Sequence, residues 1–146
     1  MKDTHRIDSL VLAVEEALRR KVKKKFGVLE ILSEVELVVL AVEALEREVN
    51  NGGYKQFFRN SSAQFTSVIV RSLELINCPK TAAITSAAIT ALALPADIVR
   101  DLASELSQQA INKLSQCDAR YLKRPENIEL QLFAFIELHQ DRIKIP

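Results

Sequence analysis

The stretch EREVNNGGYKQFFRNSS, residues 46–62, decides the fold of this chain, because it interrupts one apolar helical pattern and begins another. It contains two of the three glycines of the sequence, side by side at Gly52 and Gly53. Glycine, and after it asparagine, adopts the left-handed backbone conformation that ends a helix at the least cost. We therefore predict a sharp reversal of the chain here, with a positive φ angle at Gly52 or Gly53.

Aromatic and amide side chains surround these glycines, and they have two interpretations. The structural one places the aromatic residues beneath the preceding helix and uses the amides to bond backbone groups that the turn leaves unpaired. Its residues are Asn50, Gly52, Gly53, Phe57, Phe58 and Ser61. The functional interpretation is a polar binding site formed by Asn51, Tyr54, Gln56 and Asn60. We favour the structural role for the amides, because an amide is a poor acid, base or nucleophile.

Two helical patterns precede the turn. Apolar residues recur every three to four positions over residues 7–22, which predicts an amphipathic helix that ends near Gly27. Residues 33–36 read Ser-Glu-Val-Glu, a capping box directly before a long apolar run, so a second helix is expected to begin there. A helix this apolar belongs in the centre of a fold. Glu43 and Arg47 are four residues apart on its narrow polar strip, which favours an ion pair between them.

Helical patterns also follow the turn, and we find no strand pattern. The predicted segments are Phe65–Ile76, a helix that begins at Pro79, a helix from Pro95 to Ala110, a short helical turn at Asp118–Leu122, and a last helix at about Glu126–Arg142. Residues 1–146 are therefore predicted to form a single compact all-α domain of about six to seven helices. The basic amphipathic helix at 1–27 precedes the rest of this domain.

The end of the first predicted helix is strongly basic. Its cations are Arg19, Arg20, Lys21, Lys23, Lys24 and Lys25. One interpretation is a patch for nucleic acid or an anionic membrane. The other is that cations near a helix C-terminus are stabilised by the helix dipole. We favour the second, because Phe26 is the only aromatic residue among these cations and no base-reading motif follows.

The overall composition limits the classes of function. The 146 residues carry 20 basic and 19 acidic side chains, a net charge of +1, which is no footprint for nucleic acid. The two cysteines, Cys78 and Cys117, are expected to be free thiols in a reducing compartment. The longest uncharged stretch, Thr81–Ala96, is too short to span a membrane. We expect a soluble cytoplasmic protein without a signal peptide or a membrane contact.

The sequence contains no recognisable catalytic motif. Its two histidines, His5 and His139, lie in no metal-binding pattern, and no P-loop, GxGxxG or GxSxG occurs. Folding could bring a carboxylate pair together from Glu43, Glu46, Asp118 and Glu126, but nothing in the sequence selects one. We therefore expect no enzyme, no catalytic residue, no metal and no cofactor.

The turn and the segments after it resemble the DNA-mimic protein domain family, over about residues 32–140. The shared turn motif consists of Asn50, Asn51, Gly52, Gly53, Tyr54, Gln56, Phe57, Phe58, Asn60 and Ser61. An Asp-x-x-aromatic element further along the chain corresponds to Asp118 and Tyr121. The resemblance implies an all-α fold, and most members of this family have no known function.

The named activity of that family is imitation of DNA, in which a dimer presents acidic side chains like phosphates to a helix-turn-helix repressor. Such mimicry needs dense negative charge, whereas this chain has a net charge of +1. We therefore interpret the chain as a non-catalytic protein-interaction module. The resemblance implies a transcription regulator as its partner and a homodimer as its assembly. The alternatives are a nucleic-acid binder through residues 19–25 and a small-ligand binder or enzyme at Asn51, Gln56 and Asn60.

Overall fold

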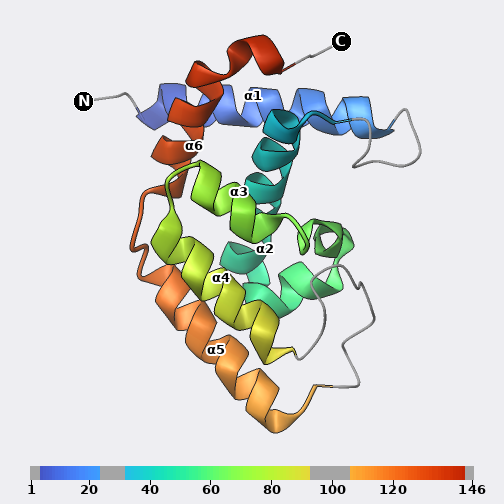
Figure 1. Ribbon diagram of the computed structural model, residues 1–146, viewed down its shortest axis with the longest axis vertical. Helices are drawn as coiled ribbons and strands as arrows, with labels where there is room; N and C mark the ends of the chain where they lie inside the picture. The colour runs from blue at the N-terminus through green and yellow to red at the C-terminus, as the bar shows by residue number, and fades with distance from the viewer. Residues whose placement is uncertain (1–3, 24–31, 93–105, 144–146) are drawn as a thin grey trace.

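Helix α2 (Glu34–Arg59) runs through the middle of the molecule, and most of the other helices pack against it (Figure 1). The computed structural model describes residues 4–23, 32–92 and 106–143. The remaining elements are α1 (Thr4–Lys23), the 3-10 helix η1 (Ser61–Phe65), α3 (Ile69–Leu75), α4 (Pro79–Ala91), α5 (Gln108–Leu122), α6 (Ile128–Leu138) and the 3-10 helix η2 (Gln140–Arg142). The described residues contain no strand, so the predicted all-α class is confirmed.

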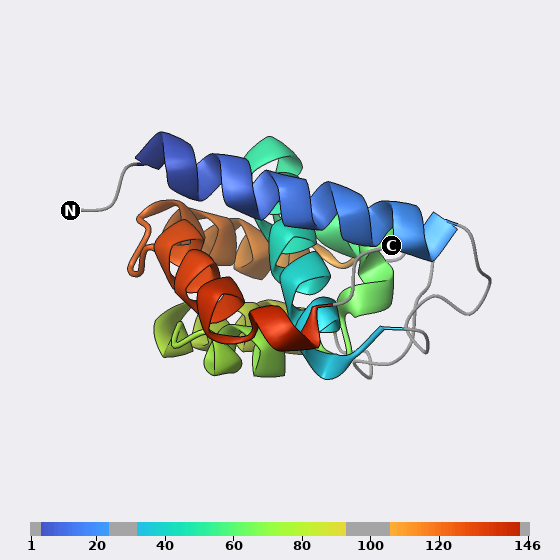
Figure 2. The same cartoon turned by 90° about the horizontal axis from the view of Figure 1, so that it is seen from above.

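The helices gather at two ends of α2. Helix α1 crosses α2 and α6 at one end, as the two perpendicular views show (Figures 1 and 2). Helices α4 and α5 lie side by side at the other end (Figure 1). Helix α3 packs between α2 and α4. No helix within the described residues is long and apolar enough to cross a membrane.

The predicted capping box starts α2. The side chain of Ser33 accepts a hydrogen bond from the N–H of Glu36 (3.1 Å), and the Glu36 carboxylate accepts one from the N–H of Ser33 (2.9 Å). Both bonds satisfy backbone donors that a helix start leaves without partners. The local sequence therefore fixes the first residue of the central helix.

Helix α4 starts at Pro79 as predicted, and a carboxylate from a distant segment caps it. Glu126, two residues before α6, accepts hydrogen bonds from the N–H groups of Lys80 (3.0 Å) and Thr81 (2.8 Å). It also accepts one from the Thr81 hydroxyl (2.9 Å). A negative charge at a helix N-terminus is favourable for the helix dipole, so Glu126 ties the start of α4 to the segment that leads into α6.

Helix α5 corrects the predicted boundaries. The chain was expected to be helical from Pro95 to Ala110 and again at Asp118–Leu122, but one continuous helix spans Gln108–Leu122. Its start is fixed by Ser107, whose hydroxyl accepts the N–H of Ala110 (3.1 Å). The apolar spacing continues across Ser107, but the cap at this residue sets the point where the helix begins. Residues 93–105 lie outside the described part of the chain.

Two other boundaries differ from the prediction. Phe65 ends the 3-10 helix η1, and α3 begins only at Ile69. The last helix ends at Leu138, after which residues 140–142 form a separate 3-10 turn. The sequence pattern gives the buried face correctly in both places, but not the points where the hydrogen-bonding pattern changes.

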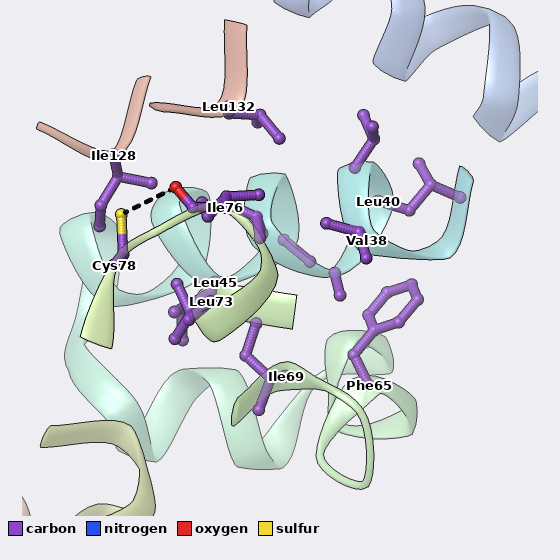
Figure 3. Packing of buried hydrophobic residues seen from close by; sticks show 14 of the residues in the cluster. Val38, Leu40, Leu45, Phe65, Ile69, Leu73, Ile76, Cys78, Ile128 and Leu132 are labelled. Carbon is purple, nitrogen blue, oxygen red and sulfur yellow. Dashed lines mark hydrogen bonds between the residues drawn. The ribbon is translucent and has the colours of Figure 1, made fainter. Parts of the chain in front are cut away.

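A hydrophobic core joins α2 to α3 and α6. Figure 3 shows Leu45 and Val38 of α2 facing Leu73 and Ile69 of α3. Leu132 and Ile128 of α6 close the core from the other side (Figure 3), and all these side chains are buried. Burial on this scale is the main favourable contribution to folding. It also orients the polar residues at the end of α2.

Both cysteines are buried free thiols, as the sequence predicts. Burial raises the pKa of the Cys78 thiol to about 12, with a further contribution from the nearby carboxylates of Glu126 and Glu46. Burial also raises the pKa of the Cys117 thiol. Since the thiolate is the reactive form, both groups should be inert in the folded protein.

We expect neither thiol to react with a disulfide reagent under native conditions at neutral pH, and both to react at once after unfolding in denaturant. Absorbance of the released thiol measures the number of reactive groups. Rapid reaction of Cys78 or Cys117 in the folded protein, or fewer than two reactive thiols after unfolding, would contradict this account.

Candidate functional site

The glycine pair divides α2 into two helical segments. Gly52 (φ −154°, ψ 17°) and Gly53 (φ 78°, ψ −178°) both lie outside the helical region, and the helix axis changes direction there (Figure 1). The predicted positive φ is therefore confirmed, at Gly53. The second segment continues to Arg59 and carries the paired aromatic residues into the core.

The aromatic residues after the turn form a stacked cluster. The rings of Tyr54 and Phe58 lie with centroids 6.1 Å apart, and Phe57 meets Phe58 edge to face at 5.4 Å. Tyr121 of α5 packs edge-on against Tyr54 at 5.8 Å. The Tyr54 hydroxyl forms a 2.7 Å hydrogen bond with Thr85 of α4. One buried ring therefore joins α2 to both helices at this end of the molecule.

A carboxylate from α5 holds the backbone at the turn. Asp118 Oδ1 accepts the N–H of Tyr54 at 2.8 Å, in the manner of a helix cap for the second segment of α2. A Cβ atom on Gly53 would lie 2.5 Å from Asp118 Oδ2, which is closer than side chains approach. Gly53 is therefore needed for two reasons, its positive φ and the room that it leaves for Asp118.

The second residue of the Asp-x-x-aromatic element binds the other side of the turn. The Tyr121 hydroxyl donates to Glu46 Oε2 (2.8 Å), and Asn50 Nδ2 donates to the same oxygen (2.8 Å). Arg124 donates to Asn50 Oδ1 at 3.0 Å. Asp118 and Tyr121 are three residues apart on one face of α5 and so bind α2 on both sides of Gly53. The sequence motif thus corresponds to a contact between α2 and α5.

The remaining amides bond a second carboxylate of α2. Gln56 Nε2 (2.5 Å) and Asn60 Nδ2 (3.1 Å) both donate to Glu48 Oε2. Asn51 is exposed at the turn. Ser61 begins η1, and its side chain lies outside the described part. Gln56 and Asn60 thus share one partner. Ligand binding by Asn51, Tyr54, Gln56 and Asn60 stays a prediction, and Tyr54 is buried.

Replacing Gly53 by Ala should lower the free energy of unfolding by at least about 1 kcal/mol, because the new methyl group meets both the unfavourable φ and Asp118. Gly52→Ala is the matched control. At Gly52 φ is negative, and a methyl group would overlap only the side chain of Gln56, which can turn away at the cost of its bond to Glu48, so a smaller loss is expected. Urea denaturation measures both variants. Equal losses, or no loss for Gly53→Ala, would contradict this explanation of the turn.

The basic end of α1 lies beside acidic residues of its own helix. Arg19 pairs with Glu15 (3.8 Å) and Arg20 with Glu16 (3.8 Å). Lys21 and Lys23 belong to α1, but their side chains lie outside the described part, as do Lys24 and Lys25 entirely. The structure therefore places only Arg19 and Arg20 of the predicted patch.

The ion pair expected between Glu43 and Arg47 is not formed, and this prediction is wrong. Arg47 instead binds Glu15 of α1 at 2.6 Å and approaches Glu48 at 3.9 Å. The reason is tertiary: α1 brings a nearly buried carboxylate within reach of the guanidinium, and such a pair is worth more than one on a helix surface. Glu43 keeps no ion pair with Arg or Lys among the described side chains.

Glu43 is a buried carboxyl group with incomplete hydrogen bonding. It is 7% exposed, and its Oε1 atom has no hydrogen-bond partner in the described part of the chain. Burial, and after it the adjacent carboxyl groups of Glu129 and Glu15, raise the pKa of Glu43 from 4.5 to about 10. The three groups come from α2, α6 and α1. No sequence signal marks this carboxyl cluster, because its members are distant along the chain.

The carboxyl cluster lies in a hollow of about 530 Å³ between α1, α2, α6 and the end of α5. Its lining residues are Leu12, Glu15, Glu16, Arg19, Glu43, Glu46, Arg47, Asn50, Arg124 and Glu129. A second, smaller groove of about 120 Å³ lies between the end of α3 and α6. It is lined by Leu75, Ile76, Asn77, Gln131, Ala134, Phe135, Leu138 and His139.

The state of Glu43 predicts a pH dependence of stability. Its pKa is raised from 4.5 to about 10 in the folded protein, so the folded state retains a proton that the unfolded chain releases. The free energy of unfolding should therefore fall as pH rises between these values, by at most about 1.4 kcal/mol per pH unit.

Glu43→Gln cannot ionise at this position, so its free energy of unfolding should lack this fall with pH. The variant should therefore become more stable relative to the wild type as pH rises. Glu74→Gln, at an exposed position of α3, is the control and should show no such trend. Urea denaturation at several pH values measures the difference. A difference between Glu43→Gln and the wild type that is constant with pH would show that Glu43 titrates normally.

These observations define a helical domain built around a kinked central helix with buried carboxylates. In the described residues, no group of three or more His, Cys, Asp or Glu side chains is arranged to hold a metal ion. The chain belongs to the DMP19-like protein family, whose model matches residues 30–139. The resemblance to the DNA-mimic family is thereby confirmed. Comparisons with curated proteins and with solved structures gave no significant match.

Proposed function

We propose that this protein is a non-catalytic protein-interaction module whose partner is a regulator of transcription. Membership of the DMP19-like family supports the general class. The observation that carries the proposal is the groove between α3 and α6, which presents large apolar side chains to solvent. The side chains that we expect to anchor the partner are Leu138, 76% exposed, and Leu75, 40% exposed.

The chemistry of the groove favours a protein partner over a nucleic acid. None of its lining residues is Lys, Arg, Asp or Glu, and its polar side chains are Asn77, Gln131 and His139. Affinity for a phosphate backbone comes from cationic side chains, which the lining lacks. Apolar side chains surrounded by amides are instead typical of the buried centre of a protein interface. We therefore infer an apolar segment of another protein as the occupant.

The acidic residues of α2 do not support imitation of DNA by this helix. A phosphate mimic needs a row of exposed carboxylates. Glu36, Glu43, Glu46 and Glu48 are all buried. Glu34 is exposed, but it pairs with Arg71 at 3.0 Å. The partner is therefore held by apolar and amide contacts, and the interaction differs in this respect from the activity for which the family is named.

Leu138→Ser should weaken the complex with the isolated partner at least about tenfold, because a central apolar anchor of an interface contributes about 2 kcal/mol or more. Leu122→Ser is the matched control. Leu122 is another exposed leucine at the end of a helix, but it lies outside the groove. The partner is purified from the native cell on the immobilised full chain, and affinity is then measured by calorimetry.

The salt dependence of that complex distinguishes binding by apolar and amide contacts from imitation of DNA. Affinity should change less than tenfold between about 50 and 200 mM salt, and duplex DNA should not compete. A loss near a thousandfold, the size expected for many phosphate-like contacts, would instead support mimicry. Equal effects of Leu138→Ser and Leu122→Ser would remove the groove from the proposal. Self-association that Leu138→Ser abolishes would assign the groove to a second copy of this chain.

A further inference from the structure

The hollow around Glu43 has the properties of a binding site that neither the family nor the proposed interaction explains. Its volume of about 530 Å³ is within the range of small-molecule pockets. The lining holds five glutamates against three arginines, an excess of acidic groups. The groove assigned to the protein partner shares none of these residues.

The arginines of the hollow already have carboxylate partners. Arg47 and Arg19 both pair with Glu15, at 2.6 and 3.8 Å. Arg124 lies 4.0 Å from Glu46 and also bonds Asn50 at 3.0 Å. The three arginines therefore neutralise Glu15 and Glu46, and none of them pairs with the carboxyl group of Glu43.

Glu43 is the group in the hollow whose bonding is incomplete. It is more than nine-tenths buried, yet its Oε1 has no partner in the described chain. Its neighbours Glu129 and Glu15 are themselves carboxyl groups. Two carboxylates can bond each other only if one is protonated, and the raised pKa of Glu43 indicates that it holds this proton at neutral pH.

We propose that this hollow binds a small organic cation, a guanidinium or ammonium group on a short aliphatic stem, and that the cation takes the place of the proton on Glu43. On binding, the O–H bond of Glu43 breaks and one proton passes to solvent, so the net charge of the site is unchanged. The Glu43 carboxylate that this leaves, whose Oε1 has no other partner in the described chain, then accepts from the donors of the cation. Leu12, which lines the hollow and is 53% exposed, packs against the stem.

A guanidinium fits this site well, for a physical reason. It is planar, permanently charged and presents several N–H donors that match carboxylate oxygens in pairs. The buried Glu43 can accept such donors once its proton leaves, because its Oε1 has no other partner in the described chain. The surrounding Glu15, Glu16 and Glu46 add to the negative potential, while Arg19, Arg47 and Arg124 on the walls exclude a highly charged cation.

The test uses the full chain and n-butylguanidinium as the probe, with n-butylurea as its neutral analogue of nearly the same shape. Isothermal calorimetry in two buffers of different ionisation enthalpy measures both the affinity and the protons released. We expect butylguanidinium to bind at least about tenfold more tightly than butylurea. We also expect close to one proton to be released per cation near neutral pH, where Glu43 is protonated.

Two variants make the assignment specific. Glu43→Gln keeps the shape of the side chain, and it should reduce the affinity for butylguanidinium at least about tenfold and abolish proton release. Glu74→Gln makes the same substitution at an exposed position of α3 and should leave both unchanged. Circular dichroism establishes that both variants are folded.

Equal binding of butylguanidinium and butylurea, binding without proton release, or full affinity of Glu43→Gln would each overturn the proposal. So would the absence of saturable binding. Loss of the protein partner in Leu138→Ser has no bearing on this outcome, because the two sites share no residue.

Discussion

The hydrogen bond from the Tyr54 N–H to Asp118 is the contact on which the arrangement of the helices depends. A helix that turns at Gly53 begins a new segment there, and its first N–H groups need acceptors. The carboxylate of Asp118 supplies one, and in doing so it fixes where α5 meets α2. Tyr121 then reaches Glu46 on the far side of the turn, so two side chains of one helix hold both halves of the central helix.

The same arrangement explains why the acidic residues of α2 point inward. Glu46 accepts bonds from Tyr121 and Asn50, and Glu48 accepts them from Gln56 and Asn60. Each buried charge therefore has donors that compensate for its loss of water. Glu43 is the exception, and it is neutral at physiological pH because burial, and next its acidic neighbours, raise its pKa. The acidic stretch of α2 is thus part of the interior, and the surface that we propose for a partner lies instead on α3 and α6.

Much of the fold could be predicted from the sequence because its signals are local. The capping box at Ser33, the start of α4 at Pro79 and the positive φ at Gly53 all depend on residues close together in the chain. The boundaries of α5 could not be predicted in the same way. There the apolar spacing continued through Ser107, although the hydroxyl of this residue caps the start of a new helix.

The candidate sites were less accessible to sequence reasoning, because they depend on packing between distant helices. The turn motif includes the amides Gln56 and Asn60, but it did not show that Glu48 is their shared partner. Arg47 was assigned to Glu43 by helical spacing, whereas α1 supplied a better partner in Glu15. The carboxyl cluster of α1, α2 and α6 follows from that exchange, and no pattern within one segment could reveal it.

Amide hydrogen exchange at Tyr54 measures directly how firmly Asp118 holds the turn. If the Asp118 carboxylate holds this N–H, it should exchange only when the protein unfolds globally, with a protection free energy equal to the stability measured in urea. In Asp118→Ala the Tyr54 amide should exchange through local opening, while amides in the middle of α3 still report the variant's own global stability. Rapid exchange of the Tyr54 amide in the wild type, at the rate of an unstructured peptide, would contradict this role of Asp118.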